Sequence, residues 1–226
     1  MLRTDIHTHL LPGVDDGSRS PVETIAMARG LAELGVERVY LTPHNFKLSN
    51  RLSPLEVKRG ADNTWRTLAR AGVSIEVRPG AEYYYGEELL DALSRGEELI
   101  PLDVDGEAHL LVELPLHQRA IGVRRVGEAI LRRNMRPVLA HPERTAGVLH
   151  EIDRVHDWVA AGWLLQLNLP SLLGRYGASA REAAHILLAE GLYAFAGSDL
   201  HRPAELEGLR HAHAAFRELT EGVPQQ

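Results

Sequence analysis

His7 and His9 stand two residues apart, directly after a short apolar run near the N-terminus. In an extended strand, residues i and i+2 point to the same face, so both imidazoles can be aimed at one point. A turn follows at residues 12–17 and carries the acidic pair Asp15 and Asp16. Imidazoles and carboxylates that converge at a strand end are typical ligands of first-row divalent metals. The alternative is that a surface histidine pair and a turn aspartate are neighbours by chance.

Further residues of metal-ligand type follow most of the other segments that we predict to be strands. These residues are His44, Glu82, Glu113, His141, Asp199 and His201. Each lies at or just beyond the carboxyl end of its strand, which is the rim where β/α barrels carry their chemistry. Counting the first strand, six of seven predicted strands end in this way, which chance does not explain. The pattern therefore predicts a site for several metal ions.

The placement of these residues at one rim requires that strands and helices alternate along the chain. Apolar patterning predicts strands at residues 2–6, 36–41, 73–78, 109–112, 137–140, 164–167 and 193–196. Helical periodicity and two Ser-Pro-x-Glu capping boxes predict helices at 21–34, 53–72, 86–95, 121–133, 148–161, 178–190 and 203–219. Seven strand–helix units predict one α/β domain over residues 1–226, a distorted seven-stranded (β/α)7 TIM-like barrel. We expect Trp65, Trp158 and Trp163, on helices or at their ends, to lie in its core.

The composition narrows the function further. The chain has 226 residues and 44% hydrophobic content, which suits one globular domain with a large core. It has no cysteine, which excludes disulfides, thiolate metal sites and a cysteine nucleophile. The net charge of −6 disfavours general binding to nucleic acid or to anionic membranes. We see neither a signal peptide nor an apolar run of the roughly 20 residues that a membrane span needs, and we expect a cytoplasmic protein.

The ligand types indicate which metals and which chemistry to expect. Imidazole and carboxylate without sulfur suit manganese, iron, zinc or magnesium. Clusters of these metals generate hydroxide near neutral pH and clamp the oxygens of a phosphoester during in-line displacement. Arg144 follows His141 by three residues, close enough to place its forked guanidinium over a bound phosphate. The alternative for Arg144 is a surface salt bridge to the neighbouring Glu143.

Five blocks of the sequence carry a resemblance to a known family. They are HTHLLPGVDDGS at 7–18, TPH at 42–44, GAEYY at 80–84, HPER at 141–144 and SDLH at 198–201. With these blocks the chain resembles the polymerase-and-histidinol-phosphatase (PHP) superfamily. Within it, the chain is similar to the manganese-dependent protein tyrosine phosphatases that accompany bacterial capsule and exopolysaccharide tyrosine kinases. The blocks cover nearly the whole chain and keep the family's order.

The resemblance implies a trinuclear site that holds three divalent metal ions. Manganese is the expected metal, with iron, zinc or magnesium as alternatives. One metal would be held by His7, His9, Glu82 and Asp199. A second would share Glu82 and would also be held by Glu113 and His141. The third would be held by Asp16, His44 and His201.

The resemblance also implies a reaction and a partner. Arg144 would bind the phosphoryl group of a phosphotyrosine on a bacterial tyrosine kinase, and a metal-bridging hydroxide would attack phosphorus. The tyrosine would leave as a phenolate, and since its pKa is about 10, it needs less proton donation than an alkoxide. Asp15 is a weak candidate for a general acid, with turn capping as the alternative role.

Other functions stay open at this stage. Histidinol-phosphate phosphatase activity is the nearest enzymatic alternative, because it belongs to the same superfamily. The nuclease branch of the superfamily is disfavoured by the negative charge and by the lack of a polymerase domain in this sequence. The alternative from another class is a non-catalytic protein that docks onto the kinase. The complete set of ligand residues argues against it, because a site that no longer functions usually loses ligands.

Overall fold

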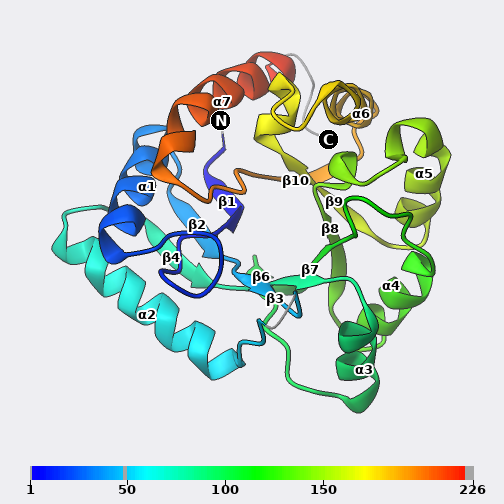
Figure 1. Cartoon of the computed structure of the whole chain (residues 1–226), viewed down its shortest axis with the longest axis horizontal. Coiled ribbons are helices and arrows are strands. Elements are labelled where there is room, and N and C mark those ends of the chain that lie inside the picture. Colours follow the sequence, from blue (N-terminus) through cyan, green and yellow to red (C-terminus); the bar gives the residue numbers. More distant parts are fainter. Residues whose placement is uncertain (1, 48–49, 222–226) are drawn as a thin grey trace.

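A ring of strands with helices around it forms the molecule (Figure 1). The computed structural model describes residues 2–47 and 50–221. The strands are β1 (Thr4–Thr8), β2 (Arg38–Leu41), β3 (His44–Asn45), β4 (Glu76–Pro79), β5 (Glu82–Tyr84), β6 (Leu102–Val104), β7 (Glu107–Glu113), β8 (Arg136–Ala140), β9 (Leu164–Asn168) and β10 (Tyr193–Gly197). The α-helices are α1 (Pro21–Glu33), α2 (Pro54–Arg70), α3 (Glu87–Arg95), α4 (Val123–Leu131), α5 (Ile152–Ala160), α6 (Ala178–Ala189) and α7 (Leu206–Thr220). Short 3-10 helices are η1 (Pro142–Arg144), η2 (Val148–Glu151), η3 (Leu169–Leu173) and η4 (Pro203–Glu205).

The strands pair in an order that follows the chain around the ring. One sheet has the order β1-β2-β4, and the other has the order β10-β9-β8-β7-β5-β3, with β6 beside β7. These pairings are parallel, except for the antiparallel pair of β6 and β7. A parallel bridge between Thr8 and Leu200 joins the end of β1 to the segment after β10. Seven strand–helix units thus form an α/β, distorted TIM-like barrel, and the predicted fold class is confirmed.

Two predicted strands are interrupted and then resume as shorter ones. Pro43, which has no backbone N–H to donate, separates β2 from β3. Gly80 separates β4 from β5, and a Cβ added to it would lie 2.3 Å from the side chain of Leu102. The two short strands pair with each other, with His44 opposite Glu82. The sequence predicts both residues at or just beyond the carboxyl end of a strand, and in the structure each begins a short new strand directly after the interruption.

The predicted starts of the two helices with capping serines agree with the structure, whereas other predicted helix boundaries differ from it. The side chains of Ser20 and Ser53 accept the backbone N–H of Glu23 and Glu56, at 3.3 Å in both cases. The reciprocal bond of a capping box forms at Ser53, whereas the carboxylate of Glu23 accepts the backbone N–H of Arg19. The helix predicted at 121–133 is shorter, because Gly122 takes a left-handed conformation with φ 80° at its N-cap. Those predicted at 148–161 and 203–219 both begin as 3-10 turns. Within the described ranges, no helix has the length and the hydropathy that a bilayer-spanning segment requires.

The tryptophans show which faces of the helices are buried. Trp158 and Trp163 are buried in the core, as predicted. The same prediction for Trp65 was wrong, since this side chain is 52% exposed. The buried residues of α2 recur at helical spacing, from Val57 to Thr64 and Leu68, and Trp65 lies off that stripe.

Candidate metal centre

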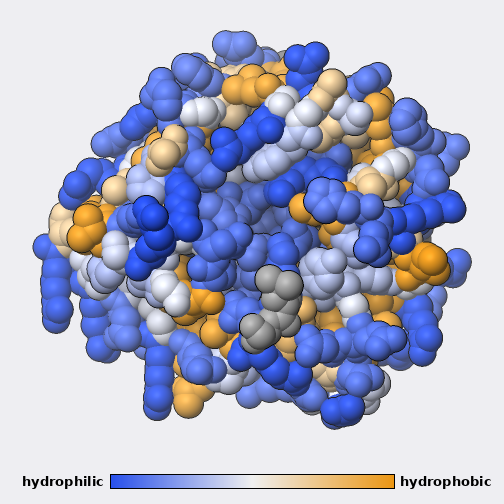
Figure 2. Space-filling model, in the orientation of Figure 1, coloured by the Kyte–Doolittle hydropathy of each residue, from blue (hydrophilic) through white to orange (hydrophobic). Residues whose placement is uncertain are grey.

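The carboxyl ends of the strands surround a polar hollow. Figure 2 shows hydrophilic residues gathered in the hollow at the centre of this face, over the strands of the ring. The side chains predicted as metal ligands meet at this mouth and come from both sheets and the loops that follow them. They are His7, His9, Asp16, His44, Glu82, Glu113, His141, Asp199 and His201. Of this set, only Asp16 is exposed and only His201 is half-buried, and the rest are buried.

His7, on β1, and His9, directly after β1, lie at the bottom of the mouth. The Nε2 atoms of His7 and His9 are 3.2 Å apart, as strand geometry predicts for residues at i and i+2. Asp199 Oδ1 lies 3.4 Å from Nε2 of His7 and 3.2 Å from Nε2 of His9. Glu82 Oε1 lies 3.4 Å from Nε2 of His7. Two imidazoles and two carboxylates therefore aim their polar atoms at one small volume.

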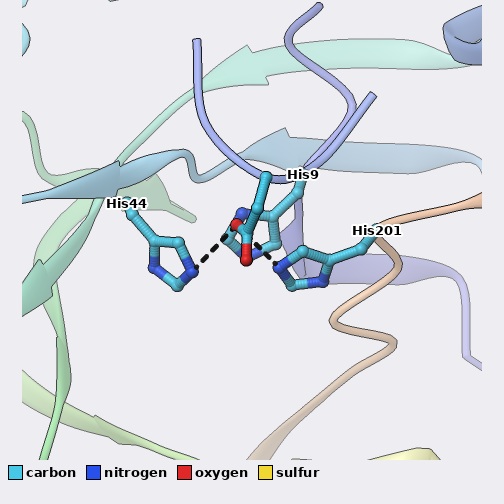
Figure 3. Close-up of side chains that lie close together, drawn as sticks. His9, His44 and His201 are labelled. Carbon is cyan, nitrogen blue, oxygen red and sulfur yellow. Dashed lines mark ion pairs between the residues drawn. The ribbon is translucent and has the colours of Figure 1, made fainter. Parts of the chain in front are cut away.

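A second group lies nearer the surface. Figure 3 shows the rings of His9, His44 and His201 close together, and Asp16, from the loop after β1, offers a carboxylate oxygen within 4.8 Å of their ligand atoms. Asp16 Oδ1 is 3.4 Å from Nε2 of His44 and 3.4 Å from Nε2 of His201. The rings of His9 and His201 stack with their centroids 3.9 Å apart. His9 thus belongs to both groups.

A third group joins the short strands to β7 and β8. Glu82 Oε2 lies 2.6 Å from Nδ1 of His44, and Glu82 Oε1 lies 3.1 Å from Nε2 of His141. Glu113 Oε1 is 4.0 Å from Nε2 of His141. His44, Glu82 and Glu113 offer ligand atoms within 4.8 Å of one another. The family resemblance implies that His44 shares an ion with Asp16 and His201, and in the structure His44 also faces Glu82 and Glu113.

The donor atoms of this centre suit divalent cations. Five imidazoles and four carboxylates without sulfur are the ligand types of manganese, iron, zinc or magnesium. Among the described residues, three of their buried atoms have no aligned hydrogen-bond partner, although cationic or imidazole nitrogens lie near the two oxygens: Glu82 Oε2, Glu113 Oε2 and His141 Nδ1. Because buried polar groups are normally satisfied, such atoms in one cluster indicate a site shaped for a bound ion. The residues present therefore fit a metal centre.

The pKa values of the side chains reflect this concentration of charge. Burial lowers the pKa of His7, but the carboxylates of Glu82 and Asp199 more than offset this and raise it to about 10. Burial and the cation of Arg144 lower the pKa of His141 to about 4. Burial alone would raise the pKa of Asp199, but neighbouring His7 and other cations hold it well below its usual range. The carboxylate is therefore ionised and ready to bind a cation.

Arg144 lies at the edge of the centre. It follows β8 on η1, its Nη1 lies 2.5 Å from Asp199 Oδ2, and its guanidinium stacks 4.0 Å from the ring centroid of Tyr176. The alternative of a surface salt bridge to Glu143 was wrong, because Glu143 is only 3% exposed and points into the protein. Its carboxylate accepts hydrogen bonds from Ser171 Oγ and from the hydroxyl of Tyr193. Glu143 thus anchors the loop that carries Arg144.

Supporting side chains that the sequence reasoning missed hold the ligands in place. Gln166 Oε1 accepts a hydrogen bond from Nδ1 of His7 at 2.9 Å, and Asn168 Nδ2 donates to Asp199 Oδ2 at 3.0 Å. Such partners fix the tautomer and the orientation of metal ligands. Their position in the sequence could have indicated this role, since Gln166 and Asn168 are the two polar residues in the otherwise apolar strand β9.

Asp15 has a similar supporting role. Its carboxylate accepts the backbone N–H of Gly17 and of His44 and lies 2.8 Å from Nδ1 of His9. These contacts turn Nε2 of His9 toward the mouth. They favour the turn-capping alternative for Asp15 over proton donation.

Comparisons with known proteins show the family and the relatives that the chain is similar to. The model of the family described as capsular polysaccharide synthesis, CpsB/CapC, matches residues 3–211. Tyrosine-protein phosphatase YwqE of Bacillus subtilis (strain 168) is 28% identical over 198 residues, which cover 87% of this chain and 76% of YwqE. Tyrosine-protein phosphatase CpsB of Streptococcus pneumoniae is 25% identical over 202 residues, which cover 87% of this chain and 82% of CpsB.

Solved structures resemble the fold as well. One comes from a study of YwqE from Bacillus subtilis and CpsB from Streptococcus pneumoniae, described as unique metal-dependent tyrosine phosphatases. It matches with a TM-score of 0.86 and 25% identity, and covers 99% of this chain and 88% of the other. The structure of hisK from Listeria monocytogenes, a candidate histidinol phosphatase, matches with a TM-score of 0.58 and 12% identity over 94% of this chain and 99% of the other. At that identity the second match shows a shared fold alone.

Proposed function

The chain belongs to the CpsB/CapC family of capsular polysaccharide synthesis, and from this membership we propose that it is a metal-dependent protein-tyrosine phosphatase. The observation that carries the proposal is the convergence of imidazoles and carboxylates from six of the seven strand–helix units on one mouth, beside the guanidinium of Arg144. Relatives that cover most of the chain are named tyrosine-protein phosphatases, which supports the same reaction.

The metal ligands in this proposal are the nine side chains at the mouth. We assign them to three divalent ions, because the ligand atoms form three groups that share His9, His44 and Glu82. We take manganese as the metal from the family resemblance. When bound, such ions lower the pKa of water and offset the negative charge of a phosphoryl group. The single domain over residues 1–226 brings all of the ligands together without a second chain.

The chain's own residues then handle the substrate. Arg144 binds oxygens of the phosphoryl group, for which its planar, permanently charged guanidinium is suited. Tyr176 stacks against that guanidinium and Asp199 pairs with it, so its position is set before substrate arrives. The departing phenolate has a pKa of about 10 and needs little proton donation, which agrees with a mouth where Asp15 is already engaged.

The proposed substrate is a phosphotyrosine on a bacterial tyrosine kinase of exopolysaccharide or capsule synthesis, in the cytoplasm. The net charge of −6 agrees with a protein substrate and not with nucleic acid. A phosphotyrosine is long enough to reach a buried centre from the surface, whereas phosphoserine is shorter. We therefore expect phosphotyrosine peptides to be hydrolysed faster than phosphoserine peptides or histidinol phosphate.

Metal removal tests the proposal. Dialysis against a chelator should abolish hydrolysis of a phosphotyrosine peptide, and added Mn²⁺ should restore it more fully than Zn²⁺ or Mg²⁺. Elemental analysis of each sample gives the bound metal, so that activity can be compared with occupancy. Full activity in a sample that contains no metal would contradict the metal-dependent reaction, and a preference for histidinol phosphate would contradict the substrate.

A further inference from the structure

Lys47 places an ammonium group inside the third group of ligands. It is one of two lysines in the chain, together with Lys58. Its Nζ lies 2.7 Å from Glu113 Oε2 and 3.3 Å from Nε2 of His44. The ammonium therefore stands next to two of the three side chains, His44, Glu82 and Glu113, that could hold one ion. A tethered monovalent cation lies beside a site that fits a divalent one.

The backbone around Lys47 holds it there. Phe46, directly before it, is buried and adopts a φ of 60°, which is uncommon for a residue with a side chain. The amide of Asn50 donates to the carbonyl of His44 at 2.7 Å, and its backbone N–H donates to the carbonyl of Lys47 at 3.0 Å. These hydrogen bonds hold the carbonyls of His44 and Lys47, and the lysine side chain lies over the ring of His44, with Nζ 3.3 Å from Nε2.

The ion pair of Lys47 with Glu113 is close but is not a well-formed hydrogen bond. Within residues 2–47 and 50–221, Glu113 Oε2 has no aligned hydrogen-bond donor, although Nζ of Lys47 is 2.7 Å away. Glu113 is 3% exposed at its side chain, and Lys47 is 30% exposed. One end of the contact is therefore fixed in the protein, while the other can swing toward solvent. A divalent ion at Glu113 would repel the ammonium and compete for the same oxygen.

We infer that Lys47 is an exchangeable counter-ion of the metal centre: its ammonium neutralises Glu113 until a divalent ion binds there, and it then moves to the mouth, where it contacts the anionic substrate. The second half of this inference rests on the proposed phosphatase function, and the first half does not. The lysine thus has two roles. Without the metal its ammonium pairs with Glu113, and with the metal bound it is a second cation, besides Arg144, that contacts the substrate.

Chemical modification of the two lysines tests the exchange without any activity measurement. The full-length protein is treated with a limiting dose of acetic anhydride, with chelator or with Mn²⁺, and the acetylated fraction of each lysine is measured by mass spectrometry. Lys58, whose side chain is 58% exposed on α2, serves as the internal reference. The ratio of Lys47 to Lys58 acetylation should rise several-fold with Mn²⁺. An unchanged or lower ratio would refute the exchange.

Metal affinity provides a second test. Lys47→Met should bind Mn²⁺ about tenfold more tightly by calorimetry, equivalent to about 1.4 kcal/mol, because the competing charge is gone. Lys47→Arg keeps the charge and should stay near the wild-type affinity, as should the matched control Lys58→Met. Unchanged or weaker binding by Lys47→Met would contradict the inference.

Kinetics separate the two halves of the inference. With saturating Mn²⁺, Lys47→Met should raise the KM for a phosphotyrosine peptide more than it lowers kcat, and Lys47→Arg should recover most of the KM. An unchanged KM would remove Lys47 from substrate binding. If the protein hydrolyses no aryl phosphate while Lys47 acetylation still rises with Mn²⁺, the proposed function fails and the counter-ion exchange stands.

Discussion

Replacing Gln166 with methionine should weaken Mn²⁺ binding while the fold stays intact. Gln166 is fully buried on β9, and methionine has a similar length without polar atoms. The substitution removes Nε2, which donates to the carbonyl of Leu167 at 2.6 Å, and Oε1, which accepts hydrogen bonds from Nδ1 of His7 at 2.9 Å and from the backbone N–H of His141 at 3.3 Å. With Nδ1 protonated, His7 turns the lone pair of Nε2 toward the mouth. One amide thus orients residues from two different strands.

The size of the effect follows from these contacts. Loss of a partner beyond the ligands typically lowers metal affinity by about 10–100-fold. This corresponds to about 1.4–2.8 kcal/mol, which agrees with the penalty of about 1–3 kcal/mol for one unsatisfied buried donor. The expected change is therefore well above the error of a calorimetric titration.

The assay is calorimetric titration of the chelator-treated protein with Mn²⁺, together with a urea unfolding curve for each variant. Gln166→Glu is the matched control, because it keeps an oxygen acceptor at the same distance along the side chain and should bind Mn²⁺ within a few-fold of the wild type. If Gln166→Met binds Mn²⁺ as the wild type does, the amide does not orient His7. Equal weakening in both variants would show that packing, and not the acceptor, matters.

Three further perturbations address the parts around the metals. Arg144→Ala should lower turnover of a phosphotyrosine peptide by about 10²–10³-fold, the effect expected when a donor to developing negative charge is lost. Elemental analysis should show an unchanged metal content, and loss of the metals would mean that the residue has a structural role. Tyr193→Phe should lower the free energy of unfolding in urea by about 1.5–3 kcal/mol, because its hydroxyl bonds the buried carboxylate of Glu143 at 2.9 Å, and an unchanged midpoint would count against that bond. Gly17→Ala should weaken Mn²⁺ binding, since the new Cβ would lie 2.3 Å from the carbonyl oxygen of His9, and a wild-type titration curve would show that the loop yields without moving His9.

Much of the fold could be predicted from local signals. The capping serines at the starts of α1 and α2 mark boundaries by a hydrogen bond within a few residues, and the structure has both. The short strands β3 and β5 could not be found in this way, because two or three residues show no periodicity. They are defined by pairing across the ring, where His44 lies opposite Glu82.

In the candidate site too, local features could be predicted from the sequence and features set by long-range contacts could not. His7 and His9 could be placed together from the period of one strand. The burial of Glu143 could not, because its partners Ser171 and Tyr193 are 28 and 50 residues away in the sequence. Trp65 illustrates the reverse error, since its type favours the core while its position on α2 exposes it. Residue type indicated the chemistry, and long-range packing decided which groups support it.

Anomalous scattering at the manganese edge, from crystals of the chelator-treated protein reloaded with Mn²⁺, tests the central claim most directly. We predict strong peaks within coordination distance of the imidazoles and carboxylates at the mouth, from His7 on β1 to His201 after β10. A crystal that contains Mn²⁺ elsewhere, with those side chains ordered and no peak between them, would contradict the metal centre and the phosphatase function that depends on it.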